Sequence, residues 1–338
     1  MAASSVVSTT KRKQNSSDPS ACFLCYRSIW KKELFGFDFR LSSILNNFTS
    51  TISERKLHFP LYTCYNVSLI DSCDGIICFK TIEYYNSHGN LVIWNPCTRK
   101  FKVLPLLENP LSLTTKTSYS FGYDQFTNSY KVVVVFCYQQ TRCCKTLVKV
   151  HTLGNNFWRT IQDFPSQLMG QPEGYMAKFV CGTINWVVLD QENDSSRVIL
   201  SLNLGNESYQ EILQPDYDLD EPLRNFSLGV SRDYLCILAH TKSFLDIWVM
   251  KDYGNKDSWS KLFTAPVVKF LDYNYGCIML GYTRLVYIFE EDDQVVLEFY
   301  NKICVYNYKD GTVKIPGIQG LFSTMFSSNV YIESLVSP

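Results

Sequence analysis

The stretch Leu91–Pro105, LVIWNPCTRKFKVLP, decides how this chain folds, because it reads as two short strands joined by a tight turn. Two apolar, strand-like runs flank Asn95, Pro96 and Thr98, and residues of these types favour turns. Basic residues follow directly after the turn. The stretch therefore predicts a β-hairpin.

The same hairpin plan recurs four more times toward the C-terminus. The segments are HTLGNNFWRTIQDFP (His151–Pro165), LNLGNESYQEILQP (Leu202–Pro215), IWVMKDYGNKDSWSKLF (Ile247–Phe263) and CVYNYKDGTVKIP (Cys304–Pro316). Successive turn markers lie 58, 51, 49 and 56 residues apart; they are Pro96, Gly154, Gly205, Gly254 and Asp310. A loose period of this size, built from strands and turns, is typical of propeller or solenoid repeats.

Strand-like runs continue from Tyr62 to the C-terminus, separated mostly by clusters of Gly, Asp, Asn, Ser or Pro. Strands of about five residues, in groups of about four per ~50 residues, fit propeller blades. The sequence therefore predicts an all-β, kelch-like β-propeller of repeated four-stranded units, with about five to six blades. A pair of β-sandwiches is the alternative architecture.

A closed ring must join its two ends, because an open sheet edge invites aggregation. GFDFRL (Gly36–Leu41) near the start and VYIESLV (Val330–Val336) at the end both read as strands. We expect these two segments to share the blade that closes the ring.

The amino-acid composition limits which binding partners and which cellular compartment we expect for this chain. The 338 residues carry 32 basic and 32 acidic side chains, so nothing points to nucleic acid or an anionic membrane. The 13 cysteines sit mostly alone in apolar runs, where a free thiol acts as a small hydrophobe. With no signal peptide and no apolar run near ~18 residues, we expect a reducing compartment, cytoplasmic and/or nuclear.

The chain is expected to divide near residue 33. Residues 1–32 begin with a Ser- and Thr-rich stretch that lacks apolar periodicity, so a disordered or degenerate N-terminal segment is predicted. Residues 33–338 are predicted to form the propeller.

Eight segments from Asp71 to the C-terminus occur in the order seen in plant F-box-associated interaction domains. The most specific are the Asn-Pro-x-Thr-Arg-Lys core, the Phe-Gly-Tyr-Asp…Tyr-Lys-Val-Val pair and Trp-x-Met-Lys-x-Tyr-Gly…Ser-Trp. The chain therefore resembles this family, whose fold is kelch-like. The resemblance implies the substrate-recognition part of a cullin-based ubiquitin ligase, with a target protein, a Skp-type adaptor and a cullin as partners.

The resemblance departs at the front of the chain. Such proteins normally begin with an F-box of about forty residues, whose amphipathic helices dock the adaptor. Residues 1–32 contain no Leu-Pro and no helical apolar stripe, so no F-box is recognisable there. Membership of a ligase is therefore a separate question from recognition of a target.

The family motifs are interpreted as scaffold, because aromatic and turn residues of a propeller usually pack between blades. These residues are Asn95, Pro96, Arg99, Gly122, Tyr123, Asp124, Tyr130, Lys131, Trp248 and Trp259. Recognition is expected instead in five variable ranges, since loops on a rigid scaffold usually carry it. These are Glu83–Asn90, Leu106–Ser118, Gln139–Lys145, Gln167–Tyr175 and Gln214–Arg224, and the predicted anchors within them are Tyr84, Tyr85, Tyr138, Tyr175 and Tyr217.

No catalytic, cofactor-binding or metal-binding residue is predicted. Cys22 and Cys25 form the only Cys-x-x-Cys pair, and no second pair follows at the spacing of a zinc site, so tail cysteines are the preferred interpretation. Four scattered histidines and the absence of a Gly-x-Ser-x-Gly elbow give no nucleophile–base pattern.

The leading hypothesis is therefore a protein-interaction module that binds a target protein for ubiquitination and is not an enzyme. The alternatives are a recognition domain uncoupled from the ligase and a glycan-binding, lectin-like propeller.

Overall fold

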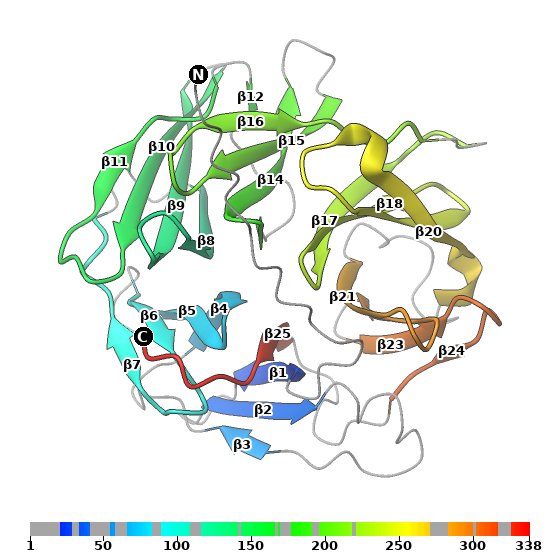
Figure 1. The fold of residues 1–338 in the computed structure, drawn as a ribbon, viewed down its shortest axis with the longest axis horizontal. Coiled ribbons are helices and arrows are strands. Elements are labelled where there is room, and N and C mark those ends of the chain that lie inside the picture. The colour runs from blue at the N-terminus through cyan, green and yellow to red at the C-terminus, as the bar shows by residue number, and fades with distance from the viewer. Residues whose placement is uncertain are drawn as a thin grey trace, which may run out of the picture.

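Six antiparallel sheets stand side by side around a central axis and form a ring (Figure 1). The structure, a computed structural model, describes residues 21–28, 34–40, 55–57, 66–82, 89–108, 116–140, 143–165, 168–169, 177–190, 196–217, 221–270, 283–299, 302–316 and 326–338. In this part of the chain the helical elements are two 3₁₀ turns, Lys256–Ser258 and Val267–Phe270. The predicted all-β propeller is confirmed, and the sandwich pair is wrong because the sheets surround an axis.

We number the sheets as blades in chain order. Blade 1 contains β1 (Ala21–Ser28), β2 (Leu34–Arg40), β3 (Arg55–Leu57) and the C-terminal β25 (Phe326–Ile332). Blade 2 contains β4 (Asn66–Cys73), β5 (Ile76–Ile82), β6 (Leu91–Trp94) and β7 (Phe101–Val103). Blade 3 contains β8 (Lys116–Asp124), β9 (Ser129–Gln140), β10 (Cys143–Thr152) and β11 (Arg159–Ile161).

Blade 4 contains β12 (Leu168–Met169) and β13 (Lys178–Val180), which both pair with β14 (Thr183–Asp190), followed by β15 (Ser196–Asn203) and β16 (Tyr209–Ile212). Blade 5 contains β17 (Asn225–Ser231), β18 (Tyr234–His240), β19 (Phe244–Met250) and β20 (Trp259–Pro266). Blade 6 contains β21 (Arg284–Phe289), β22 (Gln294–Phe299), β23 (Lys302–Asn307) and β24 (Val313–Lys314).

The five repeated hairpins of the sequence occupy one equivalent place in five blades. Each joins the third strand of its blade to the fourth, from β6 and β7 in blade 2 to β23 and β24 in blade 6. In blades 2, 4 and 6 the turn begins with an asparagine, respectively Asn95, Asn203 and Asn307. Each Oδ1 accepts hydrogen bonds from the backbone N–H groups two and three residues later. The repeat in the sequence is thus a repeat of turn chemistry.

The two ends of the chain close the ring within blade 1. The strand order is β25-β1-β2-β3, so the expected partners β2 and β25 do share a sheet, with β1 between them (Figure 1). Cys22 faces Tyr331 across the β1–β25 pair, and both side chains are buried. A C-terminal strand hydrogen-bonded to an N-terminal one leaves no open edge at the closure.

Within residues 1–32, where a disordered or degenerate segment was predicted, the structure contains a strand at Ala21–Ser28. The apolar run that starts at Cys22 forms β1, which pairs with β25 on one side and β2 on the other. Cys22 is therefore a core residue and not a tail cysteine. Sequence composition missed this strand because one of its two partners, β25, lies at the other end of the chain.

The hydrophobic cores lie between neighbouring blades. One cluster joins Val133 of blade 3 to Trp186 of blade 4, and another joins Ile77 of blade 2 to Tyr331 of blade 1. Similar clusters join blades 2 and 3, 4 and 5, and 5 and 6. Burying the apolar faces of adjacent sheets against each other fixes the ring.

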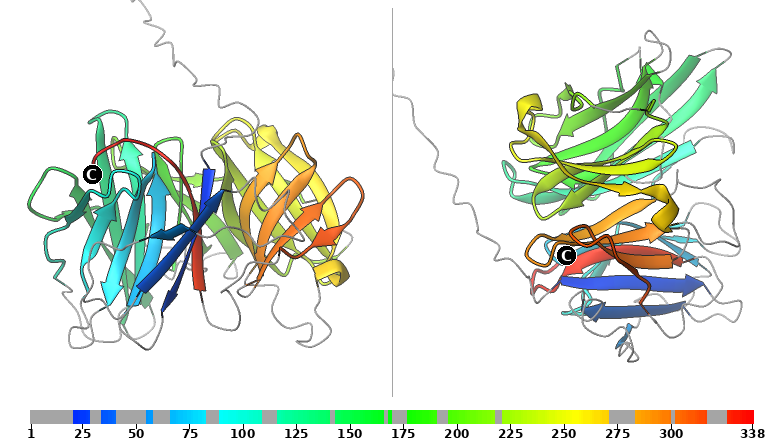
Figure 2. Two further views of the ribbon diagram at one scale, coloured as in Figure 1. Left: turned by 90° about the horizontal axis from the view of Figure 1, so that it is seen from below. Right: turned by 90° about the vertical axis from the view of Figure 1, so that its right-hand side faces the viewer.

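The ring has two chemically different faces. The turn face carries the turns between first and second and between third and fourth strands, such as Asp74-Gly75, Asn95–Lys100 and Arg232-Asp233. The loop face is the opposite one, where second strands connect to third strands and one blade connects to the next. The C-terminal residues lie on the turn face, at the top of the left-hand view of Figure 2.

No helix in the described residues is long and apolar enough to cross a membrane.

Candidate functional site

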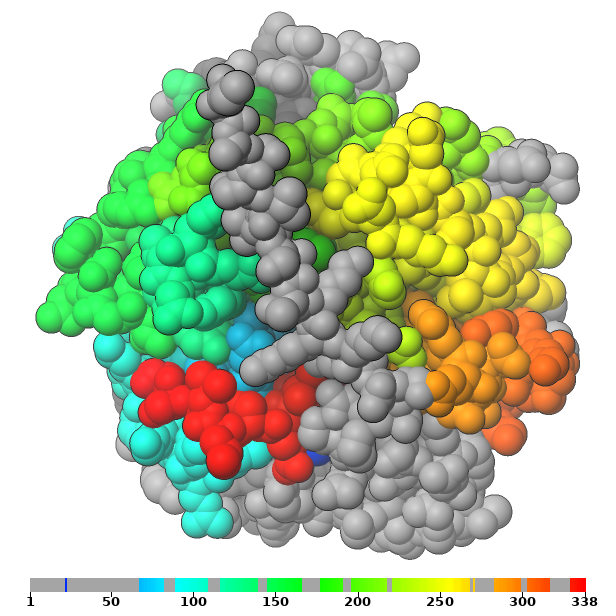
Figure 3. Space-filling view, viewed as in Figure 1, coloured from blue at the N-terminus to red at the C-terminus, as the bar shows by residue number. Residues whose placement is uncertain are grey.

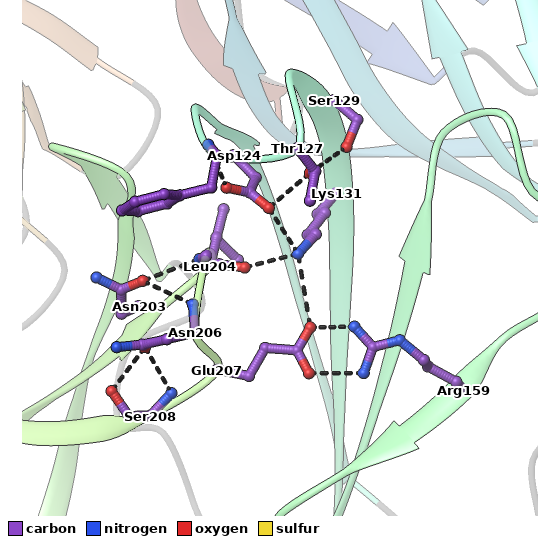
Figure 4. Close-up of polar contacts among 12 residues, drawn as sticks. Asp124, Thr127, Ser129, Lys131, Arg159, Asn203, Leu204, Asn206, Glu207 and Ser208 are labelled. Carbon is purple, nitrogen blue, oxygen red and sulfur yellow. Dashed lines mark hydrogen bonds and ion pairs between the residues drawn. The ribbon is translucent and has the colours of Figure 1, made fainter.

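A buried ion pair from the family motifs joins blades 3 and 4. The Lys131 ammonium lies 2.8 Å from an Asp124 carboxylate oxygen, and both side chains are almost fully buried. The same ammonium donates to the Leu204 carbonyl at 2.6 Å in blade 4 (Figure 4). A buried cation is tolerated when its donors are satisfied in this way.

Glu207 extends this network to the surface. One of its oxygens lies 3.5 Å from the Lys131 ammonium, and its carboxylate accepts two hydrogen bonds from the Arg159 guanidinium of blade 3 (Figure 4). The Arg159 hydrogen bond is the main reason that the pKa of Glu207 is lowered. Burial raises the pKa of Asp124, but the hydrogen bonds from Lys131 and Thr127 outweigh it, so the pKa is lowered overall. These contacts therefore stabilise the charged forms of both Asp124 and Glu207.

Gly122 allows a close approach between the same two blades. A Cβ at this position would collide with the Phe179 ring of β13. Gly122 has no positive φ, so its backbone conformation does not require a glycine. The close approach of the Phe179 ring does.

Asn95 anchors the C-terminal residues as well as its own turn. Its side chain is fully buried, and its Nδ2 donates to the carbonyl oxygens of Ser334 at 3.0 Å and Val336 at 2.7 Å. The Ser334 hydroxyl in turn donates to the carbonyl of Asp74. Figure 3 shows these C-terminal residues (red) lying over blade 2 (cyan) on the turn face. Gly75 must stay small there, because a Cβ would meet Ser334 and the Ile332 carbonyl.

Three aromatic side chains make the same contact at three blade junctions. Each sits at the start of a fourth strand and donates to a carbonyl just after the fourth strand of the preceding blade. The pairs are Trp158 Nε1 to Pro105 O at 2.9 Å, Tyr209 Oη to Gln162 O at 2.8 Å, and Trp259 Nε1 to Leu213 O at 2.9 Å. We call these the aromatic latches.

The other motif residues are placed as follows. Tyr130 donates from blade 3 to an Asp74 carboxylate oxygen of blade 2 at 3.1 Å, and its ring contacts Tyr123. Trp248 is buried in the core between blades 4 and 5, where the Lys261 ammonium lies 5.2 Å from its ring. Pro96 is buried, whereas Arg99 is exposed with a positive φ of 59°.

The five predicted anchor tyrosines are not brought together in the described residues. Tyr84, Tyr85 and Tyr175 lie outside those residues. Tyr217 packs at a ring distance of 5.9 Å against Trp248 and donates to Gln214, so it belongs to the core between blades 4 and 5. Tyr138 is half-buried at the end of β9.

The ranges expected to carry recognition share one feature. Glu83–Asn90 and Gln139–Lys145 connect second to third strands, and Leu106–Ser118 and Gln214–Arg224 lead from one blade to the next. Gln167–Tyr175 lies between β11 of blade 3 and β13 of blade 4 and includes β12. The strand ends that flank all five ranges therefore lie on the loop face.

The structure also contains a cavity on the ring axis. It has a volume of about 250 Å³ and is lined by the first strands of blades 2, 4, 5 and 6 together with β25. Asp74 and Asp233 are exposed turn residues on its rim, so the cavity opens on the turn face.

Ionisable side chains from different blades meet in this cavity. Asp71, Lys178 and Arg284 line its wall, on β4, β13 and β21 respectively. Arg284 lies 3.6 Å from the buried Glu298 of β22. Asp71 accepts hydrogen bonds from the Ser72 N–H at 2.9 Å and the Asn329 amide at 3.4 Å. Burial raises the pKa of Asp71 and, together with Arg284, lowers the pKa of Lys178.

Sequence reasoning missed this cavity because no single stretch of the sequence contains its charged residues. Asp71, Lys178 and Arg284 are separated by more than a hundred residues each and meet only when the ring closes. The signal available in the sequence was a polar residue in an otherwise apolar strand, as at Asp71. Among the described residues, no group of three or more His, Cys, Asp or Glu side chains is placed to hold a metal ion.

One known protein family matches most of this chain. Residues 32–338 match the F-box associated beta propeller domain family, so the chain belongs to that family.

Curated proteins that are similar in sequence to this chain are named as F-box proteins. An F-box/kelch-repeat protein of Arabidopsis thaliana is 27% identical over 306 residues, which cover 88% of this chain and 76% of the relative. The F-box protein CPR1 of Arabidopsis thaliana is 24% identical over 277 residues, which cover 74% of this chain and 64% of the relative. This chain therefore spans between about two thirds and three quarters of these relatives' lengths.

Solved structures resemble the chain more distantly. The Aleuria aurantia lectin superposes with a TM-score of 0.48 at 10% identity, covering 88% of this chain and 91% of the lectin. An oligogalacturonate lyase superposes with a TM-score of 0.47 at 10% identity, covering 86% of this chain and 77% of the lyase. These similarities are too low to bear on function.

Proposed function

We propose that this chain is the target-recognition domain of a plant F-box-type ubiquitin ligase subunit, which binds a target polypeptide and does not itself catalyse a reaction. The observation that carries the proposal is the family match over residues 32–338, since relatives of this family are F-box proteins. Target recognition is the part of such a subunit that a rigid propeller is suited to perform.

The distribution of the motif residues supports this proposal. Asp124, Lys131, Asn95 and Trp259 contact neighbouring blades or the C-terminal residues, so they stabilise the ring. The turn face and the loop face of the ring then remain available to bind a partner. A scaffold fixed by its own motifs can vary its surface residues without losing the fold.

Two baits test the proposal: the native chain, and the native chain fused to an authentic F-box. Each is expressed in plant cells and the captured proteins are quantified by mass spectrometry, with an unrelated propeller as control. We expect both baits to enrich the same target protein over the control. If neither does, the recognition role is wrong.

The adaptor tells whether recognition is coupled to ubiquitination. A Skp-type adaptor and a cullin captured by the native chain place it in a ligase. The same proteins captured only by the fusion identify a recognition domain uncoupled from the ligase, which would shield its target from degradation.

A further inference from the structure

We propose that the axial cavity binds an anionic oxygen group, a carboxylate or phosphate, presented by the target polypeptide, with Lys178 as the residue that receives it. This inference rests on the proposed recognition function and names the chemistry that the turn face would select.

Each of the two arginines that line the cavity has an acidic partner on its own or the neighbouring blade. Arg284 lies 3.6 Å from Glu298, and Arg232 of the β17–β18 turn lies 3.5 Å from Glu290. Each of these ion pairs is made by the Nη1 atom of its arginine.

Asp71, an acid that lines the cavity, is hydrogen-bonded by neutral donors. Asp71 accepts from the Ser72 N–H and from the Asn329 amide; burial raises its pKa, and the positive charge of Lys178 lowers it. Asp71 therefore acts on Lys178 through space, without a hydrogen bond between the two side chains among the described residues.

Lys178 is the third cation that lines the cavity, beside Arg232 and Arg284. In the described residues its ammonium has no hydrogen bond and no ion pair, although Asp71 and Glu298 act on it through space. Burial and the positive charge of Arg284 both act against its charged form. An ammonium carries three hydrogen-bond donors, which an anionic group in the cavity can use.

The size and opening of the cavity fit an entering acidic group. A volume of about 250 Å³ holds about eight waters at ~30 Å³ each, which a carboxylate or phosphate and its carrier chain can displace. The rim is made of turn residues, so a projecting acidic residue of a partner can enter from the turn face.

Thermal unfolding of the full chain tests the proposal with acetate and inorganic phosphate as probes. Each anion is titrated at constant ionic strength against chloride, because a ligand that binds only the folded state raises Tm with its concentration. The two anions separate a carboxylate from a phosphate source. The variants are Lys178→Met and, as a matched control on the same face, Lys309→Met, whose side chain is 79% exposed.

We expect Tm to rise with one or both anions in the wild type and in Lys309→Met, and to stay flat in Lys178→Met. Without any anion, Lys178→Met should keep its Tm, because it breaks no hydrogen bond or ion pair among the described residues. Asp71→Asn should strengthen the response to the anion, because it removes the internal competitor and keeps the Oδ1 acceptor.

Three results would overturn the proposal. The first is an equal rise of Tm in all variants, which is a general salt effect. The second is no rise in the wild type. The third is a marked fall of Tm in Lys178→Met that Asp71→Asn reproduces, which identifies a structural ion pair between the two. None of these results would contradict target recognition elsewhere on the ring, which the two-bait capture tests separately.

Discussion

At the scale of single residues, one asparagine holds together two parts of the chain that are far apart in sequence. Asn95 uses Oδ1 to accept from the Cys97 and Thr98 N–H groups and Nδ2 to hold the carbonyls of Ser334 and Val336. Asn203 uses only the Oδ1 half of this arrangement, for Gly205 and Asn206. The same residue type thus stabilises a turn in one blade, and a turn and the chain end in another.

The substitution Asn95→Asp should separate these two roles. An aspartate keeps the Oδ1 acceptor but places an oxygen against two carbonyls, so the free energy of unfolding at neutral pH should fall by about 2 kcal/mol. Urea unfolding measures this fall, and hydrogen exchange should show residues 333–338 losing protection.

Asn203→Asp is the matched control, because both of its turn hydrogen bonds survive. Its free energy of unfolding should change by less than about 0.5 kcal/mol. Equal losses in the two variants would mean that Nδ2 of Asn95 contributes nothing.

The Asp124–Lys131 pair predicts how stability responds to acid. The pKa of Asp124 is lowered in the folded state, so its contribution to stability is present above its unfolded pKa of about 3.9 and is lost as pH falls through the folded value. The wild type should therefore be more stable than Asp124→Asn at pH 7, and the difference should shrink below about pH 4.

Comparing the wild type with Asp124→Asn separates the titration of Asp124 from the titration of other groups. Burial lowers the pKa of His240 to about 4, so stability also falls between about pH 6.5 and 4 in both proteins, and Glu207 titrates in both. Urea unfolding from pH 7 to 3 gives the difference. A difference that is constant over this range would rule out the assigned role of Asp124.

At the scale of elements, the aromatic latches repeat a contact that no single hairpin reveals. Trp158, Tyr209 and Trp259 start the fourth strands of blades 3, 4 and 5, and each bonds to the backbone of the blade before it. Removing one latch should loosen one junction while its neighbours stay intact.

Tyr209→Phe removes one latch hydrogen bond and keeps the ring in its apolar contacts. The free energy of unfolding should fall by about 1 kcal/mol, the usual net value of one such bond. Tyr138→Phe is the matched control, since the Tyr138 hydroxyl has no hydrogen bond within the described residues. Equal effects of the two substitutions in urea unfolding would contradict the latch.

Elements whose signal is local could be predicted from the sequence. The hairpins around Asn95, Gly154 and Asp310 follow from turn chemistry within a few residues, and they were placed correctly. The strand Ala21–Ser28 was not predicted, because it is stabilised by Phe326–Ile332, some three hundred residues away. The axial cavity was missed for the same reason: its residues come from five blades.

At the scale of the whole molecule, stability depends on closure by the last strand. β25 pairs with β1 and contacts β4 of the next blade, so it supports two blades at once. The edges of the blades are protected by their neighbours only while the ring is closed.

Two truncations separate the closing strand from the residues that follow it. A chain ending at residue 325 lacks β25 and should lose its cooperative unfolding transition or aggregate, because an edge of β1 is exposed. A chain ending at Ile332 keeps β25 and loses the contacts of residues 333–338 to Asn95 and Asp74, so it should fold with a lower Tm. Circular dichroism and gel filtration distinguish the two outcomes. A chain of residues 1–325 that folds with an unchanged Tm would contradict closure by β25.

The central claim is that the closed ring is a recognition module, and the most direct measurement is a calorimetric titration. The protein captured by both baits is purified and titrated into the intact chain and into the chain of residues 1–325. The account predicts saturable binding at a one-to-one ratio to the intact chain and none to the truncated chain. Binding that is absent from the intact chain, or equal in both, would contradict it.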